Sequence, residues 1–279
     1  MLEKICDCHA HVCGPQSRYP YIAQRLYTPH DAFPADYRRM LDALGVERGV
    51  LVQPSVYGAD NRALLDALAL DPLRLRGVAV VPHDIGEAEL ERLHRAGVRG
   101  VRQNIVDLKE GKGALPLAGL RKLAQKIRPL GWHVEFLMHV DEFPDLDRQL
   151  ADFPVDVVFG HLGYVKTEKS VREDGFAALL RLMKDGKAWV KLTAPYRLTM
   201  SAMPYPDTDA FAAALVEAAP QRLLWGTDWP HVFIKTAMPD DGRLLELFRR
   251  WVPDAALQRR ILVDNPAALY SFGASQSAM

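Results

Sequence analysis

The segment Ile5-Cys6-Asp7-Cys8-His9-Ala10-His11 lies almost at the start of the chain and sets the pattern for the rest. Residues 4–6 predict a short buried strand, with His9 and His11 two residues apart at its end. In an extended chain residues i and i+2 point to the same face, so the two imidazoles are expected to be neighbours. Such a pair can hold a metal or bind an anionic oxygen, or it can be satisfied by backbone carbonyls.

Apolar strands and amphipathic helices alternate from this segment to the end of the chain. After residues 4–6, the predicted strands are 48–53, 75–81, 99–104, 132–138, 155–160, 188–193 and 222–226. The helical patterns between and after them are 34–44, 60–70, 87–96, 115–130, 144–150, 171–184, 207–218, 242–251 and 254–262, with a last turn at 266–270. Continuous apolar strands are typical of parallel sheets that are buried on both faces.

Eight strands separated by helices predict an α/β fold, a somewhat distorted (β/α)8 barrel with extra C-terminal helices, as one domain over residues 1–279. A doubly wound open sheet is the alternative, but it would usually bring a glycine-rich first turn, and none follows the first strand. The loop 14–31 is long, and Tyr19, Tyr21 and Tyr27 make it resemble a lid over a site.

The composition excludes several classes of protein. Net charge is zero at pH 7, so neither nucleic acid nor a membrane surface is expected as a partner, while a homo-oligomer is left open. No run of about 18 apolar residues and no charged-then-apolar stretch is present, so no export signal is expected. The three cysteines all lie between Cys6 and Cys13. We therefore expect a cytoplasmic protein without disulfides. A cysteine zinc site is disfavoured because Cys6 and Cys8 are expected opposite Asp7, with His9 and His11 on the face of Asp7.

In a parallel barrel the active site lies at the carboxyl ends of the strands. The polar residues expected there are His9, His11, Arg102, His139, His161 and Asp228. Each alone has an ordinary structural explanation, such as an ion-paired rim residue or a turn histidine. Five strands that deliver polar groups to one rim favour a functional site. The other histidines His30, His83, His94 and His133 are interpreted as surface residues.

Asp228 is the most informative of these residues, because it follows an apolar strand and lies between Trp225 and Trp229. Burial of a carboxyl raises its pKa toward neutrality and suits it to take and return protons, whereas cationic neighbours would lower the pKa again. The structural alternative is an aspartate that caps the next turn.

Several motifs together resemble the amidohydrolase superfamily, and within it the amidohydrolase-2 group that includes 2-pyrone-4,6-dicarboxylate lactonases. They include DCHAHVCGP (7–15), GVRGVRQN (97–104), GHLG (160–163), LLWGTDWPH (223–231) and LVDNPAALY (262–270). The resemblance covers nearly the whole chain. It implies a distorted (β/α)8 barrel and mostly hydrolytic chemistry.

The resemblance also implies roles for individual residues. Asp228 becomes the general base that activates water, and the groups around the carbonyl are His9, His11 and His161. Tyr27, Arg102 and Arg197 match positions that bind the substrate's carboxylates and ring. Two departures stand out: Asp107-Leu108-Lys109 replaces a second arginine, and Leu137 replaces a tyrosine. Because lysine does not replace an arginine clamp, a lactone with another pattern of acidic groups is expected.

These observations predict a hydrolase that opens a lactone bearing at least one carboxylate, in the catabolism of aromatic compounds. No metal is expected to be required; if zinc or manganese binds, its expected ligands are His9, His11 and Asp228. The alternative is a metal-dependent decarboxylase of the same superfamily, acting on an aromatic or muconate-type acid. A third hypothesis is a catalytically silent binding protein that keeps the barrel as a scaffold. The presence of His9, His11, His161 and Asp228 together argues against it.

Overall fold

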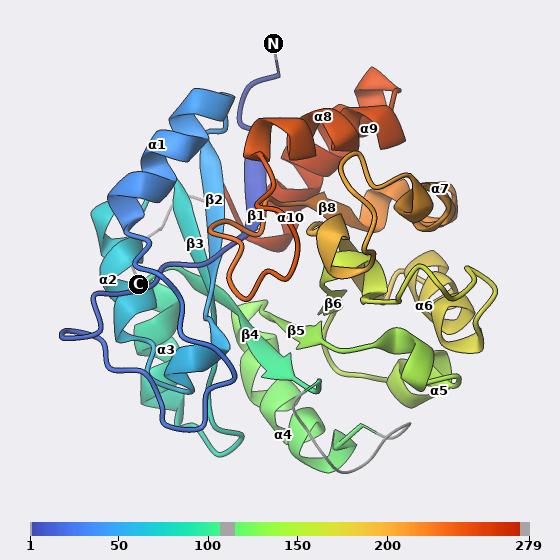
Figure 1. Cartoon of the computed structure of the whole chain (residues 1–279). Coiled ribbons are helices and arrows are strands. Elements are labelled where there is room, and N and C mark those ends of the chain that lie inside the picture. The colour runs from blue at the N-terminus through green and yellow to red at the C-terminus, as the bar shows by residue number, and fades with distance from the viewer. Residues whose placement is uncertain (1, 107–114, 274–279) are drawn as a thin grey trace.

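The computed structural model describes residues 2–106 and 115–273. Within these ranges eight parallel strands form one sheet in chain order (Figure 1). They are β1 (Cys6–Ala10), β2 (Arg48–Val52), β3 (Leu75–Ala79), β4 (Val98–Asn104), β5 (His133–Leu137), β6 (Val157–Phe159), β7 (Ala188–Leu192) and β8 (Leu223–Trp225).

The sheet closes on itself where β1 meets the segment that follows β8. The Asp228 amide donates to the His9 carbonyl at 2.8 Å, and the His11 amide donates to the Trp229 carbonyl at 2.7 Å. Gly226 permits this contact, because a Cβ there would lie 2.7 Å from the His9 backbone nitrogen. The predicted (β/α)8 barrel is therefore confirmed, while its description as one domain stays a prediction.

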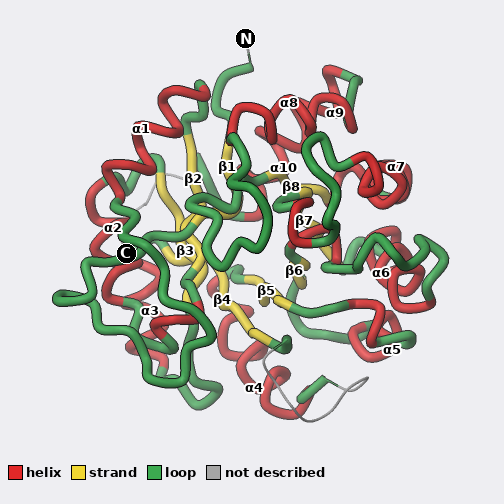
Figure 2. The backbone as a smooth tube through the Cα atoms, in the orientation of Figure 1, coloured by secondary structure: helices red, strands yellow, loops and turns green. Residues whose placement is uncertain are grey.

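Helices surround the strands in the outer layer (Figure 2). They are α1 (Pro34–Leu44), α2 (Arg62–Leu70), α3 (Glu87–Arg95), α4 (Leu117–Ile127), α5 (Leu146–Leu150), α6 (Asp174–Lys184), α7 (Asp209–Ala218), α8 (Asp241–Trp251) and α9 (Ala255–Arg259). A further helix, α10 (Asn265–Leu269), packs against the inward side chains of the strands. None of the helices in the described ranges is long and apolar enough to cross a membrane.

Local sequence explains where these elements begin and end. For example, α1 begins at Pro34, and the Asp36 carboxylate accepts a hydrogen bond from the Phe33 amide before the first turn. The helix ends at Gly45, whose φ of 69° places it in the left-handed region that glycine adopts without strain. The predicted helix 115–130 is shorter, because Pro129 lies in a separate 3-10 turn at Arg128–Leu130.

The strands bury both faces. Outward side chains such as Val101, Phe136 and Val190 pack against the helices in the main core. Inward side chains such as Cys6 and Cys8 belong to a second cluster inside the barrel. Its members are Cys6, Cys8, Val50, Val52, Val78, Val158, Trp189, Leu224, Leu269, Tyr270 and Phe272. Because the last three come from α10 and the residues after it, the C-terminal segment plugs one end of the barrel.

One histidine contradicts its sequence interpretation. His133, expected on the surface, is 1% exposed. It begins β5 and packs inside the barrel, where its ring meets that of Tyr270 edge-on at 5.3 Å. A Cβ on Gly100 of the neighbouring strand would lie 2.5 Å from His133 Nε2, so Gly100 makes the space for this ring.

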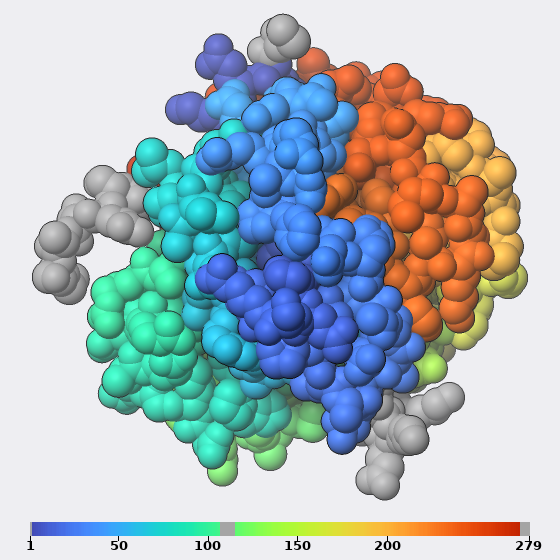
Figure 3. Space-filling view, turned by 60° about the vertical axis from the view of Figure 1, so that its left-hand side comes forward, coloured from blue at the N-terminus to red at the C-terminus, as the bar shows by residue number. Residues whose placement is uncertain are grey.

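The loop 14–31 lies on the surface beside the segment that follows β8 (dark blue beside orange in Figure 3). Its Gly14 amide donates to the Tyr57 hydroxyl at 2.7 Å, and the ring of Tyr27 stacks on Phe233 at 5.3 Å. The loop is therefore held at Gly14 and Tyr27, and Tyr27 reaches the cavity at the carboxyl ends of the strands. Its role as a lid stays a prediction.

Candidate active site

A bulge in β1 delivers His9 to the interior of the barrel. Between the pairs Asp7–Gly49 and Ala10–Leu51, β1 has one more residue than β2. An extra residue of this kind re-aims the side chains that follow it. The Asp7 carboxylate therefore faces outward, where the Tyr37 hydroxyl of α1 donates to it at 3.1 Å, whereas His9 turns inward.

The prediction that His9 shares the face of Asp7 is thus wrong, and the prediction that the two imidazoles are neighbours is confirmed. The ring centroids of His9 and His11 are 5.0 Å apart, and those of His9 and His161 are 5.1 Å apart. The register shift could not be derived from the i, i+2 rule, because a bulge breaks that rule.

Asp228 lies at the closure of the barrel and is fully buried. Its φ is 68°, a left-handed conformation that aspartate adopts more readily than most residues. Its Oδ2 accepts hydrogen bonds from the Tyr196 hydroxyl at 2.6 Å and from Arg197 Nε at 2.7 Å. Burial acts to raise the pKa of Asp228, but the Arg197 guanidinium and the neighbouring histidines hold it well below its usual range. Asp228 is therefore ionised at neutral pH.

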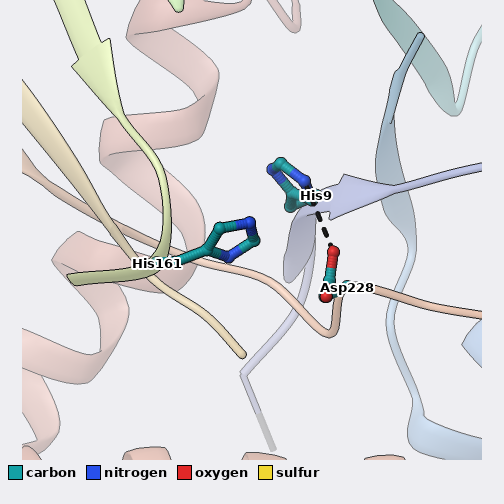
Figure 4. A group of neighbouring side chains, drawn as sticks. All are labelled: His9, His161 and Asp228. Atoms are coloured by element: carbon teal, nitrogen blue, oxygen red, sulfur yellow. Dashed lines mark ion pairs between the residues drawn. The ribbon is translucent and has the colours of Figure 1, made fainter. Parts of the chain in front are cut away.

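Three neighbouring buried side chains each keep an atom without a hydrogen-bond partner among the described residues: His9 Nε2, His161 Nδ1 and Asp228 Oδ1. The three residues can offer ligand atoms that lie within 4.8 Å of one another (Figure 4). Two imidazole nitrogens and a carboxylate oxygen suit a zinc-like divalent ion, so these residues fit a metal. Burial lowers the pKa of His9 to about 3 and that of His161 well below its usual range, so both rings are neutral.

His11 and His139 are occupied by backbone carbonyls. His11 Nδ1 lies 2.7 Å from the Val52 oxygen, and its Nε2 lies 3.5 Å from Asp228 Oδ1. His139 Nδ1 lies 2.8 Å from the Tyr164 oxygen, and the two rings stack at 4.4 Å. The cluster of ligand atoms within 4.8 Å contains His161 where the sequence suggested His11. A carbonyl at Nδ1 leaves Nε2 of His11 able to bind an ion, so the role suggested for His11 stays a prediction, and His139 contacts Tyr164.

A cavity of about 110 Å³ opens in front of this centre. Its wall includes Tyr27, Arg102 and Arg197, the three residues expected to bind substrate, together with Leu137. Arg102 is 7% exposed and spends one guanidinium nitrogen on the Gln53 carbonyl at 2.9 Å. The replaced arginine position, Asp107-Leu108-Lys109, lies outside the described residues.

Arg197 has a second task that the sequence did not indicate. Its guanidinium pairs with Asp228 Oδ2 at 2.7 Å, 31 residues further along the chain, and donates to the Val232 carbonyl at 2.8 Å. Arg197 thus orients the carboxylate of Asp228 while it faces the cavity.

Sequence reasoning missed two sets of supporting residues. Behind Asp228, the Tyr196 hydroxyl lies 2.9 Å from His231 Nδ1, and His231 Nε2 lies 3.1 Å from Asp241 Oδ1. Below His9, Lys191 Nζ lies 2.6 Å from Glu135 Oε2, and both side chains are buried. For Lys191 and Glu135, the sequence signal that could have been used is a single charged residue within an otherwise apolar strand.

The fold and this centre define a class: a (β/α)8 barrel enzyme with a histidine–aspartate centre at the carboxyl ends of its strands. Residues 6–272 match the amidohydrolase family model. The chain therefore belongs to the amidohydrolase family, as its motifs predicted.

Individual relatives are similar over most of their length. The chain is 41% identical over 273 residues to a 2-pyrone-4,6-dicarboxylate hydrolase of Comamonas testosteroni, with 95% of this chain and 89% of the relative covered. It is 40% identical over 267 residues to a 4-sulfomuconolactone hydrolase of Rhizobium radiobacter, with the same coverage. A solved structure of a probable 2-pyrone-4,6-dicarboxylic acid hydrolase from Acinetobacter baumannii, with citric acid bound, has a TM-score of 0.85 and 31% identity; the match covers 96% of this chain and 100% of that one.

Proposed function

We propose that this chain hydrolyses a lactone that carries at least one carboxylate, with Asp228 as the general base. Relatives at 40% and 41% identity are hydrolases of this kind, which confirms the prediction of a lactone-opening hydrolase. The observation that carries the role of Asp228 is its geometry. One oxygen is held by Tyr196 and Arg197, and the other faces His9 and the cavity.

In the first step Asp228 takes a proton from water as the hydroxide attacks the carbonyl carbon of the lactone. The oxyanion that forms accepts hydrogen bonds from imidazole N–H groups of the histidine cluster. In the second step the ring C–O bond breaks, and protonated Asp228 gives its proton to the leaving oxygen. The low pKa of Asp228 assists this second step, because a strong acid returns its proton readily.

Arg102 supplies the positive charge for a substrate carboxylate, since it faces the cavity and its hydrogen bond to the Gln53 carbonyl uses a single guanidinium nitrogen. The relative from Acinetobacter baumannii binds citric acid, a tricarboxylate, which supports an acidic substrate. With Asp107-Leu108-Lys109 in place of an arginine, we expect 2-pyrone-4,6-dicarboxylate to be a poor substrate.

A divalent ion would be held by His9, His161 and Asp228, where it would polarise the carbonyl as a Lewis acid. Because these three residues could bind a metal, they also support a second candidate function. It is a metal-dependent decarboxylase acting on an aromatic or muconate-type acid. We propose that lactone hydrolysis does not require the ion. Our reason is that Asp228 can perform both proton transfers and the histidine N–H groups can stabilise the oxyanion without an ion.

The test is a panel of acidic and neutral lactones at neutral pH, read with a proton-release indicator before and after treatment with a chelator. We expect an acidic lactone to be opened at an unchanged rate after chelation. No hydrolysis across the panel, together with carbon dioxide release from an aromatic acid that stops on chelation, would favour the decarboxylase.

A further inference from the structure

A buried ion pair lies in the interior of the barrel, below the candidate active site. Lys191 on β7 is 0% exposed and Glu135 on β5 is 1% exposed, and their charged atoms are 2.6 Å apart. Two buried charges rarely stabilise a fold more than apolar residues of similar size would. Their position directly behind His9 indicates a functional reason for them.

His9 Nδ1 lies between the two charges, 3.2 Å from Lys191 Nζ and 3.3 Å from Glu135 Oε1. An ammonium can only donate a hydrogen bond and a carboxylate can only accept one. The two contacts therefore demand opposite states of the same nitrogen. If Lys191 donates, Nδ1 carries no hydrogen and Nε2 carries it; if Nδ1 donates to Glu135, Nε2 keeps its lone pair.

The geometry favours the first state. Lys191 Nζ lies within hydrogen-bond geometry of His9 Nδ1 at 3.2 Å, and the Glu135 carboxylate, 3.3 Å from the same nitrogen, already accepts the shorter hydrogen bond of 2.6 Å from Lys191. We propose that Lys191, anchored by Glu135, is a positioning residue that fixes His9 in the tautomer with its hydrogen on Nε2. His9 then presents an N–H donor to the reaction centre.

This tautomer has consequences for both chemistries open to the site. Nε2 lies 3.5 Å from Asp228 Oδ1, so a hydrogen on it lies beside the general base, where it can stabilise an oxyanion; this role rests on the proposed function. A metal ion at His9, His161 and Asp228 would instead need the Nε2 lone pair. The ring hydrogen would then lie on Nδ1, facing an ammonium. Lys191 therefore opposes metal binding at a centre whose other atoms suit a metal.

Wild-type protein tests the tautomer directly and without a substrate. Long-range ¹H–¹⁵N correlation spectra of protein labelled with ¹⁵N-histidine distinguish the two tautomers, and comparison with His9→Gln assigns the His9 signals. We expect a protonated Nε2 and an unprotonated Nδ1 in metal-free protein. A hydrogen on Nδ1 would overturn the inference, whatever the enzyme's substrate proves to be.

Variants test the consequence for metal binding. Calorimetric titration of chelator-treated Lys191→Met with Zn²⁺ should show binding that is roughly 10–100-fold tighter than in wild type. Residues that contact a metal ligand usually change metal affinity by this factor, and here removal of an opposing residue should increase it. The exposed Lys184→Met serves as the matched control and should leave the affinity unchanged. Adding His161→Asn to Lys191→Met should remove the gain, which places the ion at this centre.

Activity gives a second readout, under the proposed function. In chelator, Lys191→Met should lower kcat by up to about 10²–10³, as for loss of an oxyanion donor, with a smaller change in KM. Unchanged zinc affinity together with unchanged kcat would refute a positioning role.

Lys191→Met leaves Glu135 as an unpaired buried charge and can prevent folding. The double variant Lys191→Met/Glu135→Leu removes both charges and keeps the experiment decisive. Folded double variant should still bind Zn²⁺ more tightly than wild type, since no ammonium faces Nδ1. Wild-type zinc affinity in the folded double variant would show that the pair serves stability alone.

Discussion

Both ends of the barrel hold buried polar groups, and they use them differently. At the carboxyl ends of the strands, His9, His161 and Asp228 each keep one unpartnered atom. At the other end, Arg48 and Arg76 place their guanidinium groups 5.0 and 4.8 Å from the ring centre of Phe272 and donate to backbone carbonyls. Of the first group, His161 and Asp228 line a cavity.

Unpartnered atoms alone do not distinguish the two ends. His133 has two unpartnered ring nitrogens among the described residues, yet its ring is enclosed beside Tyr270. Buried polar atoms without partners are costly wherever they occur. What marks a reaction centre is therefore the convergence of several such atoms on one accessible space, and this contrast between the two ends can be tested by mutation.

The largest effect is expected from Asp228→Asn at the open end. The variant keeps the shape of the side chain but loses the base, so kcat/KM should fall by about 10²–10⁴ while the protein stays folded. Steady-state kinetics on the best lactone and circular dichroism measure the two parts. Asp185→Asn, at the exposed end of α6, is the control. An Asp228→Asn enzyme with more than about a tenth of wild-type kcat/KM would show that the base is another group.

At the plugged end the effect should appear in stability instead. Phe272→Ala removes a ring that is 9% exposed and lies against two guanidinium groups, so the free energy of unfolding should fall by about 3 kcal/mol. Denaturant titration measures this change, and kcat of the folded variant should match wild type. Leu73→Ala, at a residue 87% exposed, should change neither quantity. A loss of kcat without a loss of stability would contradict the division between the two ends.

A smaller effect separates the two arginines of the cavity. Arg102→Met should raise KM for an acidic lactone by about tenfold or more and hardly affect a neutral lactone, because a charge-assisted hydrogen bond contributes about 1.5–3 kcal/mol. Arg197→Met should mainly lower kcat on both substrates, since Arg197 also holds Asp228 Oδ2. Identical KM effects from both variants would assign both arginines to the substrate.

Sequence patterns predicted the barrel and the residues at its rim because apolar runs mark the strands and the rim residues follow them. They did not predict the roles of Lys191 and Glu135. A single charged residue in an apolar strand is normally interpreted as lying at an exposed edge, and only the structure shows that these two side chains point into the barrel. The bulge at His9 and the burial of His133 were missed for a related reason. Both depend on register between strands, which local sequence does not determine.

The smallest expected effect is that of pH on activity. Asp228 is ionised and His9 and His161 are neutral well below neutrality, because the pKa of Asp228 is held down by Arg197 and those of the two rings by burial. We therefore expect kcat/KM, which reports the free enzyme, to stay flat from about pH 5 to pH 8.

The sign of the stability effect follows from the same shift. A carboxyl whose pKa is lowered by folding stabilises the fold above its unfolded value of about 3.9, and this contribution is lost as pH falls through the folded pKa. Activity should thus end in acid only where the protein begins to unfold. A reversible loss of kcat/KM near pH 6 in protein that stays folded would show that a group of ordinary histidine-like pKa limits the reaction. The pKa values of the groups at the cavity end would then be shifted less strongly than their burial and ion pairs indicate.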